Sequence, residues 1–473
     1  MSERQVVILS GVRTAIGDYG GSLKDIAPSE LGARVVKEAV SRSGVDPKDV
    51  GQCVIGNVIH TEPKDMYISR LACVNGGLPH DTGAFTVNRL CGSGMQAIVS
   101  ASQYILLGET DVAVAGGAES MSRAIYASLT QRWGARMGDS KMMDMMVGAL
   151  TDPFDTVHMG VTAENVAAQC GLTRADQDAF AVESHKRAAA AIAAGHFKSQ
   201  ILPIELKSKK GSVMFDTDEH VRADSSMEGM AKLKAVFIKE NGTVTAGNAS
   251  GINDAAAAVV LMEKSAAAAI AAGHFKSQIL PIELKSKKGT VIFDTDEHVR
   301  ADSSMEGMAK LKAVFIKENG SVTAGNASGI NDAAAAVVLM EKSIAAKKGL
   351  KPMARLVAYG HAGIDPKIMG LGPVSAVKRA LAKAGLKVAD MDVIESNEAF
   401  ASQALGVSKE LGLDPKKVNP NGGAIALGHP IGATGAILTV KAMYELHRTG
   451  GRYALITMCI GGGQGIAAII ERL

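Results

Sequence analysis

A tandem duplication is the feature that most constrains how this chain can fold. Residues 188–265 and 266–343 align at a constant offset of 78 and differ only at Ser212/Thr290, Met214/Ile292 and Thr243/Ser321. Solenoid proteins need three or more short units that stack on one another, whereas here one long mixed segment occurs twice. Removing one copy leaves 473 − 78 = 395 residues, and this is the length that the fold must explain.

Outside the second copy, apolar runs of strand length alternate with stretches of helical periodicity. The strand-like runs include VVILSG, CVIGNVI, VAVAGG, ARLVAYG and YALITMCI, and SELGARVVKEAVSRSG has apolar residues at helical spacing. Alternation of this kind favours layered α/β folds. The sequence therefore predicts an α/β protein.

A second, weaker repeat relates two distant parts of the chain. Residues 85–108, followed by DVAVAGGAESMS, show the same order of features as residues 422–450, followed by RYALITMCIGGGQG. Each part contains a turn, a reactive residue, glycine, a long helical pattern, a strand-like run and a Gly-Gly pair. Two similar halves that face each other would bring both helix starts and both strand ends to one site.

These patterns predict a division of the chain. Residues 1–120 form an N-terminal half, completed by about 245–265, and residues 344–473 form a C-terminal half. Residues 121–244 are rich in Met, Asp and Gly and lack a steady strand–helix rhythm, so we expect an inserted loop or lid domain. Binding residues concentrate in such insertions. Residues 266–343 are the second copy of 188–265.

Composition excludes several classes of function. The formal charge is only +3 without a long basic run, which argues against nucleic acid as a partner. No stretch approaches the roughly 20 apolar residues of a membrane span, and the N-terminus lacks a signal-peptide core, so we expect a cytoplasmic protein. The cysteines are too scattered for a disulfide framework or a CxxC zinc site, and no metal is expected; they are Cys53, Cys73, Cys91, Cys170 and Cys459.

Cys91 is the first candidate for chemistry. It lies in NRLCGSGMQA, where glycines permit a tight turn and a helical pattern begins directly afterwards. A lone cysteine is more often a small buried apolar residue, but the glycine-bounded helix start favours a nucleophile. The positive end of the helix dipole predicts a lowered pKa for this thiol.

His429 and Cys459 occupy comparable places in the second half. His429 stands between glycines in ALGHPIGATG, where its imidazole could take a proton from Cys91, although a lone histidine is equally compatible with a structural role. Cys459 ends an apolar strand-like run and precedes the glycine-rich stretch IGGGQG. That stretch could suggest a phosphate loop, but it has neither the Walker lysine nor the dinucleotide-binding spacing.

Taken together, CGSGMQA, AGNASGIND, ESNEAF, GHPIGATGA and CIGGGQG resemble the thiolase family, and the two-domain ketothiolases of broad short-chain specificity most of all. The resemblance covers the chain apart from the extra copy. It implies a five-layered α-β-α-β-α fold of two similar halves with an inserted lid. It also implies Claisen condensation of two acyl-CoA molecules, or thiolysis of 3-ketoacyl-CoA, through an acyl-cysteine. Acetyl-CoA and coenzyme A would be substrates, with no permanently bound cofactor, and the protein would be a homo-oligomer, either dimer or tetramer.

The resemblance also implies roles for individual residues. Cys91 matches the nucleophile that becomes acylated, and Cys459 matches the second cysteine, which moves the α-proton. His429 matches the histidine that activates the nucleophile and helps to form an oxyanion hole, in which Asn397 holds a water. Gly461 and the Cys91 amide match a second oxyanion hole.

The resemblance also places coenzyme A against the lid and implies which residues contact it. Taken alone, each of them is more often structural, the methionines above all. The nucleotide and pantetheine path would be lined by His158, Arg222, Phe237 and Ser250. The acyl pocket would be bordered by Met159 and Met369.

Three of these residues have twins in the second copy, namely Arg300, Phe315 and Ser328. One site has room for one set, and we expect the first copy to hold it, because the helical pattern AFAVESHKRAAAAIAAG runs into that copy without a break. We expect the spare copy to be unable to bury its apolar strand against an occupied sheet. One departure from the family is Ala255, where many relatives have glycine.

Two other interpretations remain. Ketoacyl-carrier-protein synthases share the layered fold and a nucleophilic cysteine, but pair it with two histidines or a histidine and an asparagine and lack a second thiol such as Cys459. The chain could also be an inactive scaffold whose function was lost through the duplication. All the predicted residues of the chemical step lie outside the duplicated segment, which favours an enzyme.

Overall fold

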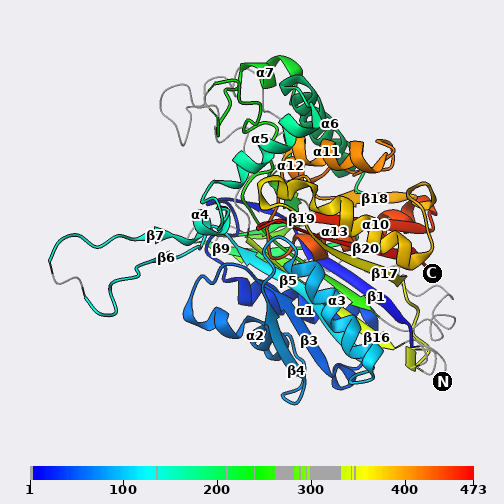
Figure 1. Ribbon diagram of the computed structural model, residues 1–473. Coiled ribbons are helices and arrows are strands. Elements are labelled where there is room, and N and C mark those ends of the chain that lie inside the picture. Colours follow the sequence, from blue (N-terminus) through cyan, green and yellow to red (C-terminus); the bar gives the residue numbers. More distant parts are fainter. Residues whose placement is uncertain are drawn as a thin grey trace.

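The computed structural model describes residues 4–134, 137–208, 211–238, 240–261, 282–286, 289–293, 296–298, 332–341, 344–345 and 348–473. Figure 1 shows two similar halves side by side, the N-terminal half in blue and the C-terminal half in yellow to red. A lid, coloured cyan to green, lies against both of them. The described segments thus have the arrangement that the two sequence halves predict.

Each half is built on mixed strand pairing. In the N-terminal half the order is β4-β3-β5-β16-β12-β1, in which β16 (Asp332–Glu341) comes from the second copy. Strands β4, β3 and β5 are parallel, and β12 pairs antiparallel with both β1 and β5. In the C-terminal half the order is β18-β19-β20-β17, and Val418 adds a parallel bridge to Ile394 of β18. The strands of the first half are β1 (Val6–Thr14), β3 (Gln52–Gly56), β4 (Gly83–Val87), β5 (Val112–Ser120) and β12 (Asn253–Leu261). Those of the second are β17 (Ala354–Gly363), β18 (Val393–Ser396), β19 (Tyr453–Ile460) and β20 (Gln464–Arg472).

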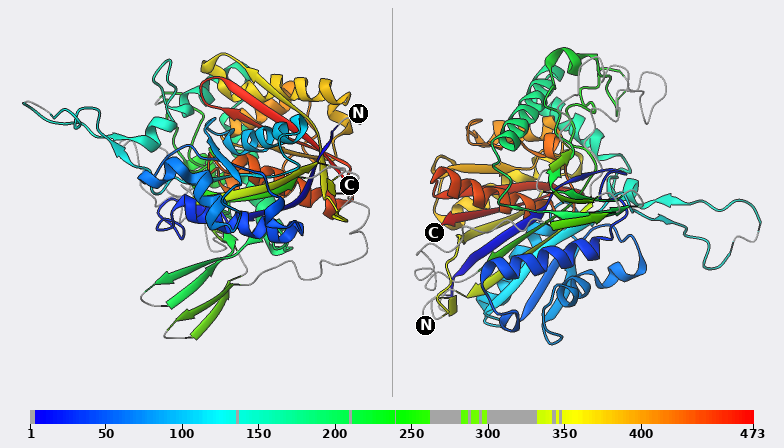
Figure 2. Two further views of the ribbon diagram at one scale, coloured as in Figure 1. Left: turned by 90° about the horizontal axis from the view of Figure 1, so that it is seen from below. Right: turned by 180° about the vertical axis from the view of Figure 1, so that it is seen from behind.

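Helices complete five layers (Figure 2). α1 (Pro28–Ser43) and α2 (Ile68–Asn75) pack together, and α1 covers the outer face of the first sheet. α3 (Ser93–Leu107) and α13 (Thr434–Thr449) pack on each other between the sheets, and α10 (Gly372–Ala384) covers the second sheet, beside α11 (Ala401–Leu411). The predicted α-β-α-β-α fold is confirmed.

Most residues of α13 are buried because both faces of this helix are covered. Only the last turn of α13 reaches solvent, and small residues allow α3 to approach it closely. A Cβ on Gly94 of α3 would lie 3.0 Å from the backbone nitrogen of Ala436, and one on Gly435 would lie 2.3 Å from that of Met95. The two helix starts therefore meet, as the weak internal repeat predicts.

The lid is more regular than its sequence suggested. The predicted loop domain contains α4 (Met145–Ala149), α5 (Met159–Cys170), α6 (Arg174–Ala193) and α7 (Met227–Lys232). It also contains the strand pairs β6 (Tyr126–Ala127) with β7 (Met143–Asp144) and β9 (Ile204–Ser208) with β10 (Gly211–Phe215). The β6–β7 pair forms an arm that projects far from the body (Figure 1).

Shorter elements connect these parts. The remaining strands are β2 (Gly17–Asp18), β8 (Ile201–Leu202), β11 (Thr217–Asp218), β13 (Ile282–Ser286), β14 (Gly289–Phe293) and β15 (Asp296–His298). α12 (Ala424–Leu427) and 3₁₀ helices at Pro47–Asp49, Pro63–Tyr67, Pro366–Leu371 and Val388–Asp390 complete the described elements. No helix in the described ranges combines the length and apolarity needed to cross a membrane.

The first copy is tied to the N-terminal half through a buried ion pair. α6 continues across the start of that copy at Ala188, as its helical pattern predicts. Downstream, both oxygens of Asp218 accept from the guanidinium of Arg13, at 2.6 and 2.9 Å, and both side chains are fully buried. Asp296, the twin of Asp218, instead lies in β15 opposite Thr217.

One expectation about the second copy is wrong. Its strand β16 is not excluded from the sheet, because it pairs with both β1 and β5. Val114 lies opposite both Val338 and its twin Val260, and Ile8 lies opposite both Leu339 and its twin Leu261. A strand has only two edges for hydrogen bonds, and the other edge of Val114 faces β3. The strands β12 and β16 also pair with each other in parallel, with Ala257 opposite its twin Ala335 and Val259 opposite its twin Val337.

Candidate active site

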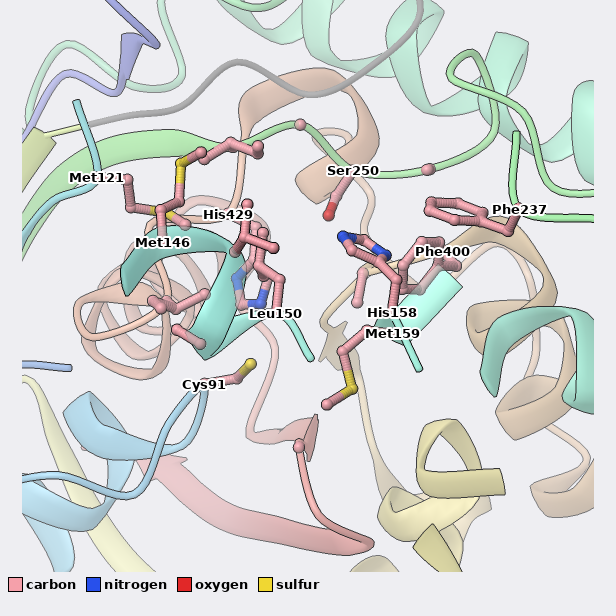
Figure 3. A pocket seen from close by; sticks show the side chains of 18 of the residues that line it. Cys91, Met121, Met146, Leu150, His158, Met159, Phe237, Ser250, Phe400 and His429 are labelled. Carbon is pink, nitrogen blue, oxygen red and sulfur yellow. The ribbon is translucent and has the colours of Figure 1, made fainter. Parts of the chain in front are cut away.

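A cavity of about 330 Å³ opens where the lid meets the two halves. Figure 3 shows Cys91, His429 and Leu150 on one side of it and His158, Phe237 and Phe400 on the other. Most of its lining is apolar, so a charged group inside it would be poorly solvated. The lining residues predicted from the sequence are Cys91, His158, Met159, Phe237, Ser250, Met369, His429, Cys459 and Gly461.

Cys91 lies in a tight turn directly before α3. Leu90, which precedes it, has a positive φ of 45°, a conformation that non-glycine residues rarely adopt. Burial raises the pKa of the Cys91 thiol to about 11, although the N–H groups of Gly461 and of Cys91 itself lower it. The predicted lowering of this pKa by the helix start is therefore wrong, because the cost of burying the thiolate exceeds the gain from the amides. The resting group is a thiol that needs a base.

His429 is fixed by two hydrogen bonds and by the tight turn that precedes it. Its backbone N–H donates to Asn253 Oδ1 at 2.9 Å, and its Nδ1 lies 2.7 Å from Thr434 Oγ1. Gly428, before it, has a φ of +112°, and a Cβ there would lie 2.2 Å from Cγ of Asn253. Only glycine fits this turn. Burial lowers the pKa of His429 to about 4, so the ring is neutral near pH 7 and can accept a proton.

Asn397 and Cys459 are the other two predicted polar residues: Cys459 lines the cavity, whereas Asn397 lies behind the lining and contacts His429. Asn397 follows β18, and its Nδ2 lies 3.4 Å from His429 Nε2. Its Oδ1 is buried and has no hydrogen-bond partner among the described residues, so it is free to accept from a bound molecule. Cys459 is buried near the end of β19, where burial and then the neighbouring Cys91 raise its pKa well above the ordinary thiol value.

The opposite wall of the cavity is aromatic. His158 stacks on Phe237, with ring centroids 4.8 Å apart and an interplanar angle of 15°, and Phe237 meets Phe400 edge to face. Burial lowers the pKa of His158 to about 4, so this ring is neutral as well. Ser250 lines the same cavity, and its backbone N–H donates to Ala399 O at 2.8 Å. This wall suits a long, mostly uncharged ligand chain.

The remaining predicted contacts have different outcomes. Met159 and Met369 line the cavity in one apolar cluster with Cys459. Arg222 is buried, its backbone N–H donates to His185, and it is not among the residues that line the cavity. Arg300, Phe315 and Ser328 lie outside the described residues.

Sequence reasoning missed several residues of the site. Thr434 and Asn253 hold His429, and Glu119 lies beneath the loops around Cys91. Thr434 follows His429 by five residues at a helix start, a spacing that could have indicated a contact. Met121 and Met146 line the cavity on the side of Cys91, and methionine in a lid gives no distinguishing signal.

Comparison with known proteins agrees with this geometry. Residues 6–265 match the family described as "Thiolase, N-terminal domain", residues 263–343 match it a second time, and residues 350–472 match "Thiolase, C-terminal domain". The chain is similar to "Beta-ketothiolase BktB" of Cupriavidus necator, with 56% identity over 470 residues that cover 99% of this chain and 100% of the relative. It is 41% identical to an "Acetyl-CoA acetyltransferase" of Syntrophomonas wolfei, over 99% and 100% of the two chains.

Solved structures show the same likeness. The crystal structure of the Bacillus anthracis acetyl-CoA acetyltransferase has a TM-score of 0.81 at 38% identity and covers 100% of this chain and 99% of that chain. The human mitochondrial 3-ketoacyl-CoA thiolase has a TM-score of 0.81 at 37% identity, with 100% of both chains covered. Sequence, fold and cavity thus agree, and the chain belongs to the thiolase family.

Proposed function

We propose that this protein is an acyl-CoA C-acyltransferase, a β-ketothiolase that condenses two acyl-CoA molecules or cleaves 3-ketoacyl-CoA with coenzyme A. The observation that carries the proposal is the meeting of two thiols, Cys91 and Cys459, with a neutral His429 at one apolar cavity. A condensing enzyme needs one group to carry the acyl chain and another to remove an α-proton. Two thiols and one imidazole supply both.

In the first half-reaction, His429 Nε2 takes the proton from Cys91 as its sulfur attacks the thioester carbon. The carbon–sulfur bond to coenzyme A then breaks, and Cys459 gives its proton to the departing thiolate. The N–H groups of Gly461 and Cys91, which already point to the Cys91 sulfur, support negative charge that develops beside it. The raised pKa of Cys459 makes its thiolate a strong base, which suits the proton removal of the second half-reaction.

In the second half-reaction, the Cys459 thiolate removes a proton from the α-carbon of the incoming acetyl-CoA. The resulting carbanion attacks the acyl carbon on Cys91, a carbon–carbon bond forms, and the Cys91 sulfur leaves and recovers its proton from His429. A water bound by both Asn397 Nδ2 and His429 Nε2, which lie 3.4 Å apart, would hydrogen-bond the enolate oxygen. Thiolysis runs through the same steps in reverse.

Coenzyme A and acyl-CoA are the proposed substrates, and no permanently bound cofactor is needed. The pantetheine chain fits between the stacked pair His158–Phe237 and Ser250, which line the same cavity as Cys91. One of the similar solved structures is the human mitochondrial 3-ketoacyl-CoA thiolase in complex with CoA. We assign no contact with the nucleotide to Arg222, because the structure does not bring this residue to the cavity.

We also propose a cytoplasmic homo-oligomer, either dimer or tetramer. The projecting β6–β7 arm exposes large apolar side chains that a monomer would leave in water; Tyr126 is 60% exposed, Leu129 79%, Trp133 88% and Met137 96%. Exposed apolar surface of this kind marks interaction sites. Light scattering of the purified protein before and after removal of the arm tests this.

Thiolysis by purified protein tests the enzyme function. Acetoacetyl-CoA and 3-ketovaleryl-CoA are mixed with coenzyme A, and loss of the ketoacyl thioester is followed by absorbance. We expect cleavage of at least one substrate, with acyl transfer to Cys91 detected by mass spectrometry of its peptide. Absence of both cleavage and acyl-enzyme in folded protein would favour the inactive scaffold.

A further inference from the structure

Glu119 is a buried carboxylate that the proposed chemistry does not use. It lies near the end of β5, has no exposed surface, and receives four N–H groups. Asn57 Nδ2 and Ile59 N donate to Oε1 at 3.3 and 3.1 Å, and Val58 N and Gly432 N donate to Oε2 at 3.0 and 2.9 Å. Burial raises the pKa of Glu119 to about 8, although the N–H groups of Ile59, Val58 and Gly432 oppose this shift by stabilising the anion. The group is therefore anionic at the alkaline pH where Cys91 loses its proton.

The four donors come from both halves of the protein. Residues 57–59 follow β3 in the first half, and Gly432 belongs to the turn of the second half that carries His429. Side chains from these same loops, Val58, Ile59 and Ile431, pack in one apolar cluster with Cys91. One carboxylate therefore holds the backbone on which the surroundings of the nucleophile and of the base are both built.

The strand register shows that Glu119 has a counterpart in the second half. Gly56 of β3 lies opposite Gly117 of β5, and Ser396 of β18 lies opposite Thr457 of β19. Asn57 directly follows Gly56, and Asn397 directly follows Ser396. Glu119 stands two residues after Gly117, and Cys459 stands two residues after Thr457.

The first half thus uses its asparagine and strand-end residue to hold the neighbouring loops, while in the second half Cys459 lines the cavity and Asn397 contacts His429. Close steric packing keeps Glu119 and the loops that it binds in a rigid arrangement. A Cβ on Gly432 would lie 2.3 Å from Glu119 Oε2, and a Cβ on Gly117 would lie 2.1 Å from Gly432 O. Because the turn is enclosed so tightly, it cannot shift to another acceptor without moving His429.

We propose that Glu119 is a positioning residue that fixes the relative placement of Cys91 and His429 by binding Val58, Ile59 and Gly432 on one carboxylate. The inference rests on the proposed function in that these two residues are taken as nucleophile and base. It concerns their geometry and not the identity of the substrate.

Glu119→Gln tests the proposal. The glutamine keeps the shape, but its NH₂ faces two N–H groups where an oxygen accepted them, so the loops must move. We expect the rate of Cys91 acylation by acetyl-CoA to fall about 10²-fold, as for a displacement of about 1 Å, with the KM nearly unchanged. A folded Glu119→Gln protein with the wild-type acylation rate would overturn the proposal.

Alkylation of Cys91 by iodoacetamide gives a readout that lost stability would not move. The Glu119 charge raises the pKa of Cys91, so its loss in Glu119→Gln should shift the alkylation profile to lower pH. Glu119→Asp keeps the charge but is too short to reach both loops, so acylation should slow without that shift. Glu445→Gln is the matched control, at a buried carboxylate near the far end of α13 that binds Asn421 and Arg448. It should change neither the acylation rate nor the pH profile of alkylation. An unshifted Glu119→Gln profile would contradict the proposal.

Gly432→Ala tests the positioning role of Glu119 if the Glu119→Gln protein does not fold. The added methyl group collides with the carboxylate, so acylation should slow, and Glu119→Asp in the same chain should restore part of the rate by making room. Purely additive effects would overturn the proposal. Wild-type protein that transfers no acyl group would instead refute the proposed function, because alkylation of Cys91 is measured without turnover.

Discussion

Nδ1 of His429 lies 2.7 Å from the hydroxyl oxygen of Thr434, and that hydroxyl donates its own proton to Pro430 O at 2.8 Å. A hydroxyl has one proton, so in this contact the ring must be the donor and Nδ1 must carry its hydrogen. The neutral ring then presents an unprotonated Nε2. Thr434 thereby selects the tautomer that can deprotonate Cys91.

Replacing Thr434 by valine should remove the preference of His429 for the tautomer with its proton on Nδ1. We expect Thr434→Val to slow acylation of Cys91 about 10- to 100-fold, since part of the ring population would carry its proton on Nε2. Thr434→Ser keeps the acceptor and should stay within a few-fold of wild type. Thr439→Val makes the same change on α13, where the hydroxyl donates to Gly435 O at 2.8 Å, and serves as the control. Equal rates for Thr434→Val and wild type would refute the tautomer argument.

Cys91→Ser should reduce acyl-enzyme formation at least about 10³-fold. A serine hydroxyl has a much higher pKa than a thiol, and the weakly basic His429, with its pKa of about 4, is a poor partner for it. Rapid-quench mass spectrometry with acetyl-CoA measures the acylated fraction. A transferase rate close to wild type in Cys91→Ser would remove this residue from its role.

Cys459→Ala should separate the two half-reactions. Acylation of Cys91 should persist, with coenzyme A leaving more slowly, whereas exchange of the methyl protons of bound acetyl-CoA with deuterated solvent should fall by about two to four powers of ten. NMR of the recovered acetyl-CoA reports the exchange. If exchange continued at the wild-type rate, another group would be the base.

The pH dependence should reflect the neutral state of His429. Because burial lowers its pKa to about 4, the ring stays unprotonated from pH 7.5 down to 5, and kcat/KM for acylation should be nearly flat over that range. The unfolded ring binds a proton below its ordinary pKa of about 6.5, so the contribution of this group to stability falls as the pH drops from 6.5 towards 4. An acid limb of the rate centred near pH 6.5 would show that the ring is not desolvated in solution.

Deleting residues 266–343 should leave a 395-residue enzyme of equal or higher stability. β16 would be lost, but its twin β12 continues with the same residues and can fill the whole place beside β1 and β5. Thermal unfolding of both chains measures the difference. A clear loss of stability on deletion would mean that the second copy contributes packing that the first cannot replace.

Matched substitutions in the full-length chain show which copy is in place. Asp218→Asn leaves the buried Arg13 without its charged partner and should cost about 3 kcal/mol, whereas Asp296→Asn should be nearly silent. The reverse result would place the second copy against β1.

Local patterns in the sequence determined most of the architecture. Strand periodicity and glycine-bounded helix starts depend on neighbouring residues, so the two halves, the layer order and the continuity of α6 could be predicted. The same patterns singled out Cys91, His429 and Cys459, which the structure brings to one cavity, while their roles stay predictions.

The tertiary structure decided what depends on distant neighbours. The pKa of Cys91 follows from its burial among lid and strand-end residues, which outweighs the local effect of the helix start. Likewise β16 enters the sheet because a strand pairs with whatever edge accepts it, and its sequence cannot distinguish it from its twin β12. The four donors of Glu119 come from loops that are distant in sequence and adjacent only in the fold. Spacing along the chain reports local conformation, whereas solvation and pairing depend on how the chain closes on itself.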